Sequence, residues 1–204
     1  MSACAAPFSS VYFQPDGVVK SCCATGLELG RLSPRSGVTI ASILAGTPVA
    51  EHAAALDAGD FSLGCEECGI PARQGRREDS LAAMFDRYAS EARPPFPRVM
   101  DFALSNRCNL QCVMCNGRLS SAIRAHRERG APLAPAYGEA FFSELADYLP
   151  HLDLAIFKGG EPFLSPETQR VWDLMLELEV RCETSVTTNA TIWNARVERY
   201  LRDL

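Results

Sequence analysis

Three cysteines on one short segment are the residues whose type and spacing most clearly indicate chemistry. Cys108, Cys112 and Cys115 follow the pattern CxxxCxxC. A four-iron cluster normally takes four protein thiolates, so three thiolates leave one iron free for a ligand from outside the protein. Zinc is the alternative metal, but zinc sites favour ligand pairs two residues apart, and a fourth ligand would have to come from elsewhere in the chain.

A glycine-rich turn follows the next predicted strand, the apolar run 152–157. This turn consists of Gly159, Gly160, Glu161 and Pro162. Glycines let the backbone approach a ligand closely, and a carboxylate pairs with an ammonium group. Such a turn is unremarkable alone, so its meaning depends on the cysteines that precede it.

A polar segment at 186–191 (VTTNAT) closes the last predicted strand. Its Asn189 has two interpretations. It lies beside a bound cofactor, or it forms an ordinary turn, because Asn tolerates left-handed backbone geometry.

In this order, the cysteine triplet and the Gly-Gly-Glu-Pro turn resemble the motifs of the radical S-adenosylmethionine (radical SAM) superfamily. The resemblance implies a [4Fe-4S] cluster whose free iron is chelated by the amino and carboxylate groups of S-adenosylmethionine. It also implies that residues 159–162 hold the cofactor's amino group, that Met114 packs near its adenine, and that Asn189 lies beside it.

The family's reaction is reductive cleavage of S-adenosylmethionine at the cluster, giving a 5′-deoxyadenosyl radical that abstracts hydrogen from a substrate. By resemblance, the expected partners are a peptide or small-metabolite substrate and an electron donor such as flavodoxin or ferredoxin. The substrate and the residues that contact it stay open.

A second group of cysteines suggests a second metal centre in the N-terminal third. Its members are Cys22, Cys23, Cys65 and Cys68. With the segments 15–17 and 29–30, they resemble the twitch domain, a shortened SPASM auxiliary-cluster module, which implies a second iron–sulfur cluster. Adjacent cysteines seldom both reach one cluster, so Cys4 is a further candidate ligand. A zinc knuckle and a vestigial site are the alternatives.

The remaining cysteine and the histidines are assigned no chemistry. Cys182 begins a predicted strand, and free cysteine is among the most buried residue types, which favours packing. His52, His126 and His151 have no partner motif and are predicted to be surface residues.

Composition excludes several function classes. The 204-residue chain carries a formal net charge of −5 without a basic stripe, which argues against nucleic acid or anionic membranes as partners. The sequence has no run of eighteen apolar residues and no export signal at its start. Seven of the nine cysteines are grouped, which in a reducing compartment indicates metal ligands, so a cytosolic location is expected.

The predicted elements divide the chain into segments 1–76, 77–97 and 98–204. The first is a small Cys-rich domain with a β-hairpin (strands 9–13 and 18–21), a helix over 48–57 that Thr47 caps, and a ligand-bound loop over 61–77. A linker helix over about 78–91 follows.

Residues 98–204 alternate strands and helices, which predicts an α/β fold with about three βα units and a parallel sheet. Active-site loops are expected at the carboxyl ends of its strands. Since the family's barrel has six such units, the resemblance implies a partial radical SAM barrel that is truncated, with an open sheet edge.

The alternative function is a non-catalytic iron–sulfur or zinc-binding module, truncated or completed by another chain. A plain ferredoxin fits less well because each of its clusters needs four thiolates.

Overall fold

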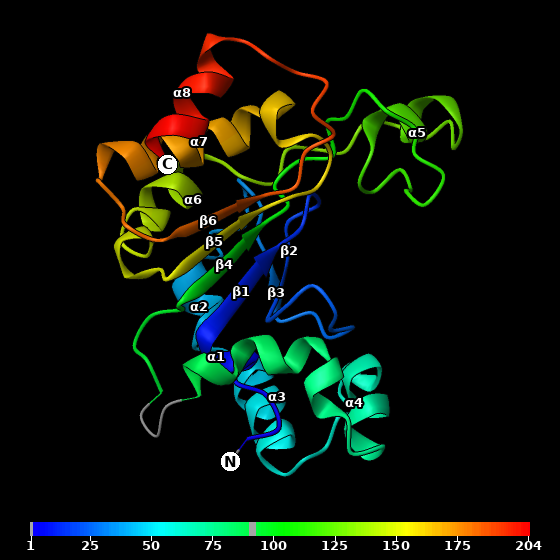
Figure 1. The fold of residues 1–204 in the computed structure, drawn as a ribbon, viewed down its shortest axis with the longest axis vertical. Helices are drawn as coiled ribbons and strands as arrows, with labels where there is room; N and C mark the ends of the chain where they lie inside the picture. The colour runs from blue at the N-terminus through cyan, green and yellow to red at the C-terminus, as the bar shows by residue number, and fades with distance from the viewer. Residues whose placement is uncertain (1, 90–92) are drawn as a thin grey trace.

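A six-stranded sheet forms the centre of the computed structural model, which describes residues 2–89 and 93–204. The strands are β1 (Ser10–Phe13), β2 (Val18–Lys20), β3 (Gly30–Arg31), β4 (Val99–Phe102), β5 (Leu154–Phe157) and β6 (Glu183–Val186). They lie in the order β3-β2-β1-β4-β5-β6, with β1, β4, β5 and β6 mutually parallel and β2 and β3 antiparallel to their neighbours. In Figure 1 the four parallel strands point toward α5.

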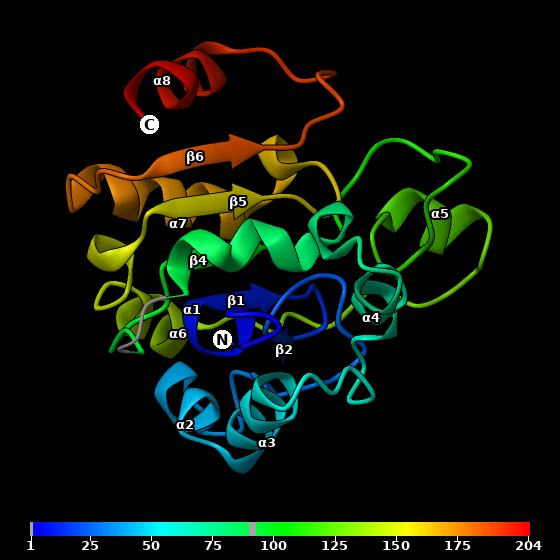
Figure 2. The ribbon, with the colours of Figure 1, turned by 60° about the horizontal axis from the view of Figure 1, so that its bottom comes forward.

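Helices lie on both faces of the sheet. The α-helices are α1 (Ala6–Ser9), α2 (Ile40–Leu44), α3 (Thr47–Asp57), α4 (Glu66–Arg73), α5 (Ser121–His126), α6 (Glu139–Leu145), α7 (Pro166–Glu177) and α8 (Ala195–Asp203). The 3₁₀ segments are η1 (Arg77–Asp79), η2 (Leu81–Tyr88), η3 (Leu149–His151) and η4 (Pro162–Leu164). In Figure 2, η2 crosses the near side of the strands and α7 lies behind them.

One face of the sheet carries the larger core. Met100 and Phe102 of β4 point toward this face and share a core with Phe141 of α6 and Trp172 of α7. Phe102 stacks on Phe157 of β5, with ring centroids 5.0 Å apart. The three predicted βα units are therefore present with the parallel strand order expected for them.

The opposite face carries a second core near the amino ends of the strands. Val99 and Leu154 contribute from the sheet, and Leu56 of α3 and Phe85 of η2 pack over them. Cys4 and Cys22 belong to the same cluster of buried residues. Because side chains alternate along a strand, Asp101 also points to this face.

The Cys-rich segment is continuous with the βα units. The predicted hairpin is confirmed as β1 and β2, but β1 also pairs in parallel with β4. Val11 and Phe13 of β1 thus lie in the same core as Phe102. The segments 1–76 and 98–204, which the sequence suggested as separate domains, share one sheet.

Several predicted elements differ in detail. The expected loop over 61–77 contains helix α4, whose first turn holds Glu66 and Glu67. The expected linker helix is present as the 3₁₀ segments η1 and η2, and its predicted end at 90–91 lies outside the described residues. Helix α3 begins at Thr47 and follows Gly46, so the expected Thr47 cap is wrong.

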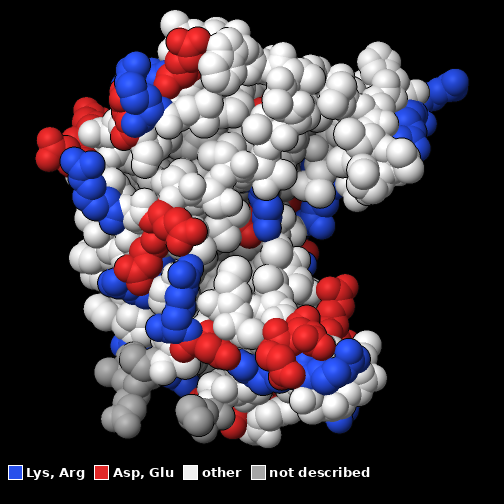
Figure 3. Space-filling model, in the orientation of Figure 1, with Lys and Arg blue, Asp and Glu red and all other residues white. Residues whose placement is uncertain are grey.

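Within residues 2–89 and 93–204, the structure contains no helix with the length and apolar character that crossing a membrane requires. Figure 3 shows Lys, Arg, Asp and Glu side chains intermixed on the visible face, in keeping with the absence of a basic stripe from the sequence.

Candidate functional site

The CxxxCxxC segment lies in the loop that follows β4, at the carboxyl edge of the parallel strands. Cys108 and Cys115 are partly buried, Cys112 is exposed, and none forms a disulfide. The Cys108 sulfur accepts an N–H from Leu110 at 3.4 Å and one from the Asn189 side chain at 3.8 Å. Hydrogen bonds of this kind are typical around cysteine sulfurs that bind metal.

Two glycines bring the loop after β5 against this cysteine loop. Gly159 and Gly160 have φ angles of +81° and +58°, which side chains rarely tolerate. A Cβ atom on Gly160 would lie 2.3 Å from the Arg107 carbonyl oxygen, and one on Gly159 would lie 2.7 Å from the Ala103 side chain. The close approach of the two loops therefore depends on both glycines.

Glu161 joins the loops after β4, β5 and β6. Its backbone N–H donates to the Arg107 carbonyl at 2.7 Å. Its carboxylate is fully buried and accepts hydrogen bonds from the Thr188 hydroxyl at 2.8 Å and from the backbone N–H groups of Asn189 at 2.7 Å and Phe163 at 3.1 Å. The carboxylate thus ties the loops together and is turned away from solvent.

Asn189 completes the link between the last loop and the cysteines. In addition to its contact with Cys108, its side chain donates to Asn109 at 3.0 Å. Asn109 in turn donates to the Thr191 hydroxyl at 2.8 Å. The structure therefore brings together Cys108, Glu161 and Asn189, three of the residues that the sequence predicted for the site.

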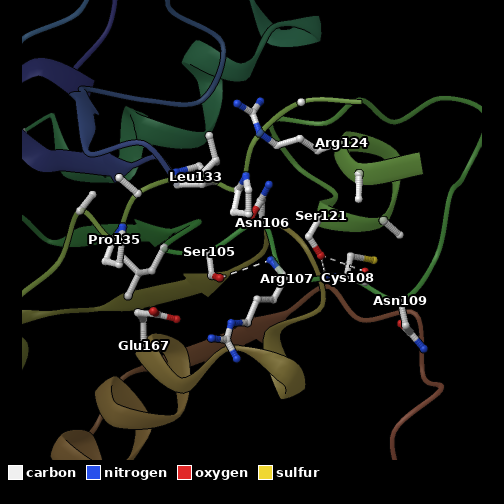
Figure 4. Close-up of a pocket in the computed structure, with 18 of the residues that line it drawn as sticks. Ser105, Asn106, Arg107, Cys108, Asn109, Ser121, Arg124, Leu133, Pro135 and Glu167 are labelled. Carbon is white, nitrogen blue, oxygen red and sulfur yellow. Dashed lines mark hydrogen bonds between the residues drawn. The ribbon is translucent and has the colours of Figure 1, made fainter. Parts of the chain in front are cut away.

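A cavity of about 660 Å³ opens beside Cys108, between the loop after β4 and the segment 121–136, which contains α5. Figure 4 shows Cys108, Ser121, Arg107 and Glu167 around it, with a hydrogen bond of 3.1 Å from the Cys108 N–H to the Ser121 hydroxyl. Its volume is in the range of small-molecule sites.

Among the residues predicted for this site, Cys108 alone lines the cavity. Met114 is 87% exposed. Pro162 is buried and is the first residue of η4, directly after Glu161. Pro162 therefore belongs to the loop after β5.

A second site lies on the other face of the sheet, where a small cavity is lined by four thiols. These thiols belong to Cys4, Cys22, Cys65 and Cys68. Burial raises the pKa of Cys4 to about 11 and that of Cys22 to about 12. Without a metal Cys4 and Cys22 are therefore neutral near pH 7, and a bound metal would take them as thiolates.

Cys4 lies in this cavity where the sequence had favoured Cys23. The Cys23 side chain is exposed and does not line the cavity. Residues 2–5, which precede α1, bring Cys4 in, where its sulfur accepts the Ala6 N–H at 3.4 Å.

His52 was missed as a functional candidate. The prediction of a surface position is wrong, because the residue is 1% exposed and lines the four-thiol cavity. Its Nε2 is 3.1 Å from the Cys65 sulfur and its Nδ1 is 3.3 Å from the Ser21 hydroxyl. Burial lowers the pKa of His52. The only indication of burial in the sequence is the run of alanines and other apolar residues around His52 in TPVAEHAAALD.

The other residues without assigned chemistry behave largely as expected. Cys182 is partly buried and packs against the larger core. His126 is exposed, and His151 stacks on Phe96 with ring centroids 4.0 Å apart.

Both cysteine groups fit iron–sulfur ligation by their chemistry: their thiols are free, and N–H groups point at Cys4 and Cys108. Across the described ranges, however, no three His, Cys, Asp or Glu side chains form a group that could hold a metal ion as they stand. Binding would therefore require the side chains to adjust.

Comparison with known proteins returned no match: no protein-family model, curated protein or solved structure resembles this chain closely enough to count.

Proposed function

We propose that this chain is a radical SAM enzyme, or the N-terminal part of one, with a [4Fe-4S] cluster on Cys108, Cys112 and Cys115. The observation that best supports the proposal is the hydrogen-bonded connection of the cysteine loop to the Gly-Gly-Glu loop and to Asn189. Two motifs separated by more than forty residues thereby meet at one edge of the sheet, as a shared cofactor site requires.

When bound, the cluster and S-adenosylmethionine supply reductive cleavage of the sulfur–carbon bond and a 5′-deoxyadenosyl radical. The chain's own residues position the reactants. Cys108, Cys112 and Cys115 would supply three thiolates, and the backbone of Gly159 and Gly160 would hold the cofactor's amino group. Glu161 keeps that backbone in place, because its carboxylate is already used by Thr188 and Asn189.

The sheet fits the fold that this proposal needs. Strands β4, β5 and β6 would form part of a radical SAM barrel, with the Cys-rich segment as a twitch-like auxiliary domain that extends the same sheet through β1. Substrates of the peptide or small-metabolite class, an electron donor such as flavodoxin or ferredoxin, and a cytosolic location belong to the same proposal.

The four-thiol cavity is the proposed auxiliary centre. Its ligands would be Cys4, Cys22, Cys65 and Cys68, which line one enclosed space beneath η2 and α3. Thiolate ligands suit both iron–sulfur clusters and zinc.

Anaerobic iron–sulfur reconstitution followed by electron paramagnetic resonance (EPR) spectroscopy tests the main site. The reduced full chain should give a [4Fe-4S] signal that changes when S-adenosylmethionine is added. C112A should abolish the change, whereas C182S, a substitution at a cysteine outside both sites, should preserve it. A chain that takes up only zinc, or a signal that ignores S-adenosylmethionine, contradicts the proposal.

The four-thiol cavity also favours a second candidate function, a non-catalytic metal-binding module. This alternative predicts that C108A, C112A and C115A together leave all bound metal in place, because the cavity alone would hold it. Radical SAM chemistry predicts the loss of one full cluster from the same triple variant. Iron, zinc and sulfide analysis of both proteins separates the two functions.

A further inference from the structure

His52 occupies a central position in the four-thiol cavity. It projects from the middle of α3 and lies between Ser21, which follows β2, and Cys65, which precedes α4. His52 is 1% exposed and Ser21 is fully buried, so their hydrogen bond is shielded from water, and the contact with Cys65 is partly buried. The imidazole is therefore held by partners from two separate segments of the chain.

The hydrogen-bonding capacities of the groups fix the direction of both contacts once a metal is bound. A metal-bound Cys65 sulfur has no proton and only accepts. Nε2 of His52 must then carry the hydrogen and donate it across the 3.1 Å contact. Nδ1 is left without a hydrogen and accepts from the Ser21 hydroxyl at 3.3 Å. The Cys65 thiolate thus selects the ring tautomer, and the Ser21 hydroxyl, which can donate or accept, satisfies the other ring nitrogen and holds the ring in place.

We propose that His52 sets the reduction potential of the auxiliary iron–sulfur centre by donating an Nε2–H hydrogen bond to the Cys65 sulfur, with Ser21 holding the ring in place through Nδ1. The inference rests on the proposed function, since it needs an iron–sulfur cluster in the four-thiol cavity. His52 is thereby a positioning residue that acts through Cys65.

The expected sign follows from charge. Reduction adds an electron, so the reduced centre is more negative and its sulfurs are stronger acceptors. A donor to sulfur therefore stabilises the reduced state more than the oxidised one and raises the potential. Partial burial of the contact strengthens the effect, because the local dielectric is lower than that of bulk water.

The test measures the midpoint potential of the auxiliary centre alone. The full chain carrying C108A, C112A and C115A removes the main cluster, and an EPR-monitored redox titration then reports the remaining centre. H52L should shift the midpoint to a more negative value. H52Q, whose amide N–H can replace Nε2, should stay closer to the parent. S21A should shift it in the same direction as H52L, but less.

H126L is the matched control, because it makes the same change at an exposed histidine and should leave the midpoint unchanged. Equal midpoints in the parent, H52L and S21A would overturn the inference, as would uptake of zinc without iron in the triple-cysteine background. S21A keeps the test decisive if H52L fails to fold. The response of the main cluster to S-adenosylmethionine plays no part here, so the proposed function is judged separately.

Discussion

Cys22 and Cys23 are neighbours in the chain, yet only Cys22 is buried in the four-thiol cavity. Cys4, eighteen residues earlier, lines the cavity with it. We therefore expect C4S to lower the auxiliary iron content sharply in the background that lacks the main cluster ligands, because one of four thiolates is lost. C23S is the matched substitution and should retain the iron. Equal losses of iron and of the cluster's EPR signal in both variants would contradict this ligand set.

The choice between Cys4 and Cys23 shows what the sequence could not provide at the residue scale. The CxxC spacing of Cys65 and Cys68 and the grouping of thiols predicted three of the four cysteines that line the cavity. Which thiol of the 22–23 pair turns inward depends on the path of the chain after β2, and spacing alone does not determine it. His52 was missed for the same reason, because its partners Ser21 and Cys65 lie 31 and 13 residues away.

Asp101 gives the chain a pH-dependent stability. Burial raises its pKa to about 6, and the Lys158 ammonium 2.5 Å away offsets only part of that effect. Its second carboxylate oxygen, Oδ1, has no hydrogen-bond partner among the described residues. Because the folded pKa lies above the unfolded value of 3.8, the group's contribution is fully present below pH 3.8 and is lost as the pH rises through about 6.

We expect this loss to reach about 3 kcal/mol in the free energy of unfolding, from a difference of roughly two pKa units. Urea denaturation between pH 4 and pH 7 measures it. D101N should flatten the profile over this range. D153N alters an exposed carboxylate paired with Arg98 and should leave the profile as it is. A parent profile without this decline would show that Asp101 ionises freely.

At the scale of elements, Glu161 connects the ends of three strands. E161Q replaces a carboxylate acceptor of three hydrogen bonds with an amide that offers one oxygen and an unwanted donor. We expect a loss of about 1–3 kcal/mol in stability. We also expect faster hydrogen exchange at the Asn189 amide and a weaker EPR response to S-adenosylmethionine.

E177Q is the matched control for this prediction. Glu177 is the exposed last residue of α7 and does not line the cavity beside Cys108. Unchanged exchange at Asn189 in E161Q would show that the loop after β6 holds its position without Glu161, which would remove the main support for a shared site.

The strands and long helices could be predicted because each has a clear pattern. The sequence Ser165-Pro166-Glu167 is typical of a helix start, and the Ser165 hydroxyl accepts from the Thr168 N–H at the beginning of α7. Helix α4 was hidden because it contains Gly69 and Pro71, residues that favour loops. Packing explains Gly69, since a Cβ there would lie 2.7 Å from the Phe61 Cβ.

At the scale of the whole molecule, β1 is the element that unites the chain. It lies between β2 of the Cys-rich segment and β4 of the first βα unit. Phe13 stacks on Phe102 at 5.6 Å and meets Phe141 edge-on at 5.3 Å. The sequence could predict β1 but not its partner, because parallel pairing with β4 joins residues nearly ninety positions apart.

Since the two cores flank one sheet, they should unfold together. Urea titration of the metal-free chain can follow both halves at once: Trp172 fluorescence in a W193F background reports the βα units, and thiol reactivity of Cys4 and Cys22 reports the Cys-rich segment. The two transitions should coincide. F13A should move both midpoints down together by an amount equivalent to about 3–5 kcal/mol, because it empties a fully buried site that both segments share.

V38A, at a side chain that is 39% exposed, should move neither midpoint appreciably. If the thiols of Cys4 and Cys22 became reactive well below the urea concentration at which Trp172 fluorescence changes, the Cys-rich segment would be a separately folding domain. The β1–β4 pairing would then stabilise the chain too little to couple its halves. Coincident transitions would instead mean that one cooperative unit positions both the proposed auxiliary centre and the proposed main cluster.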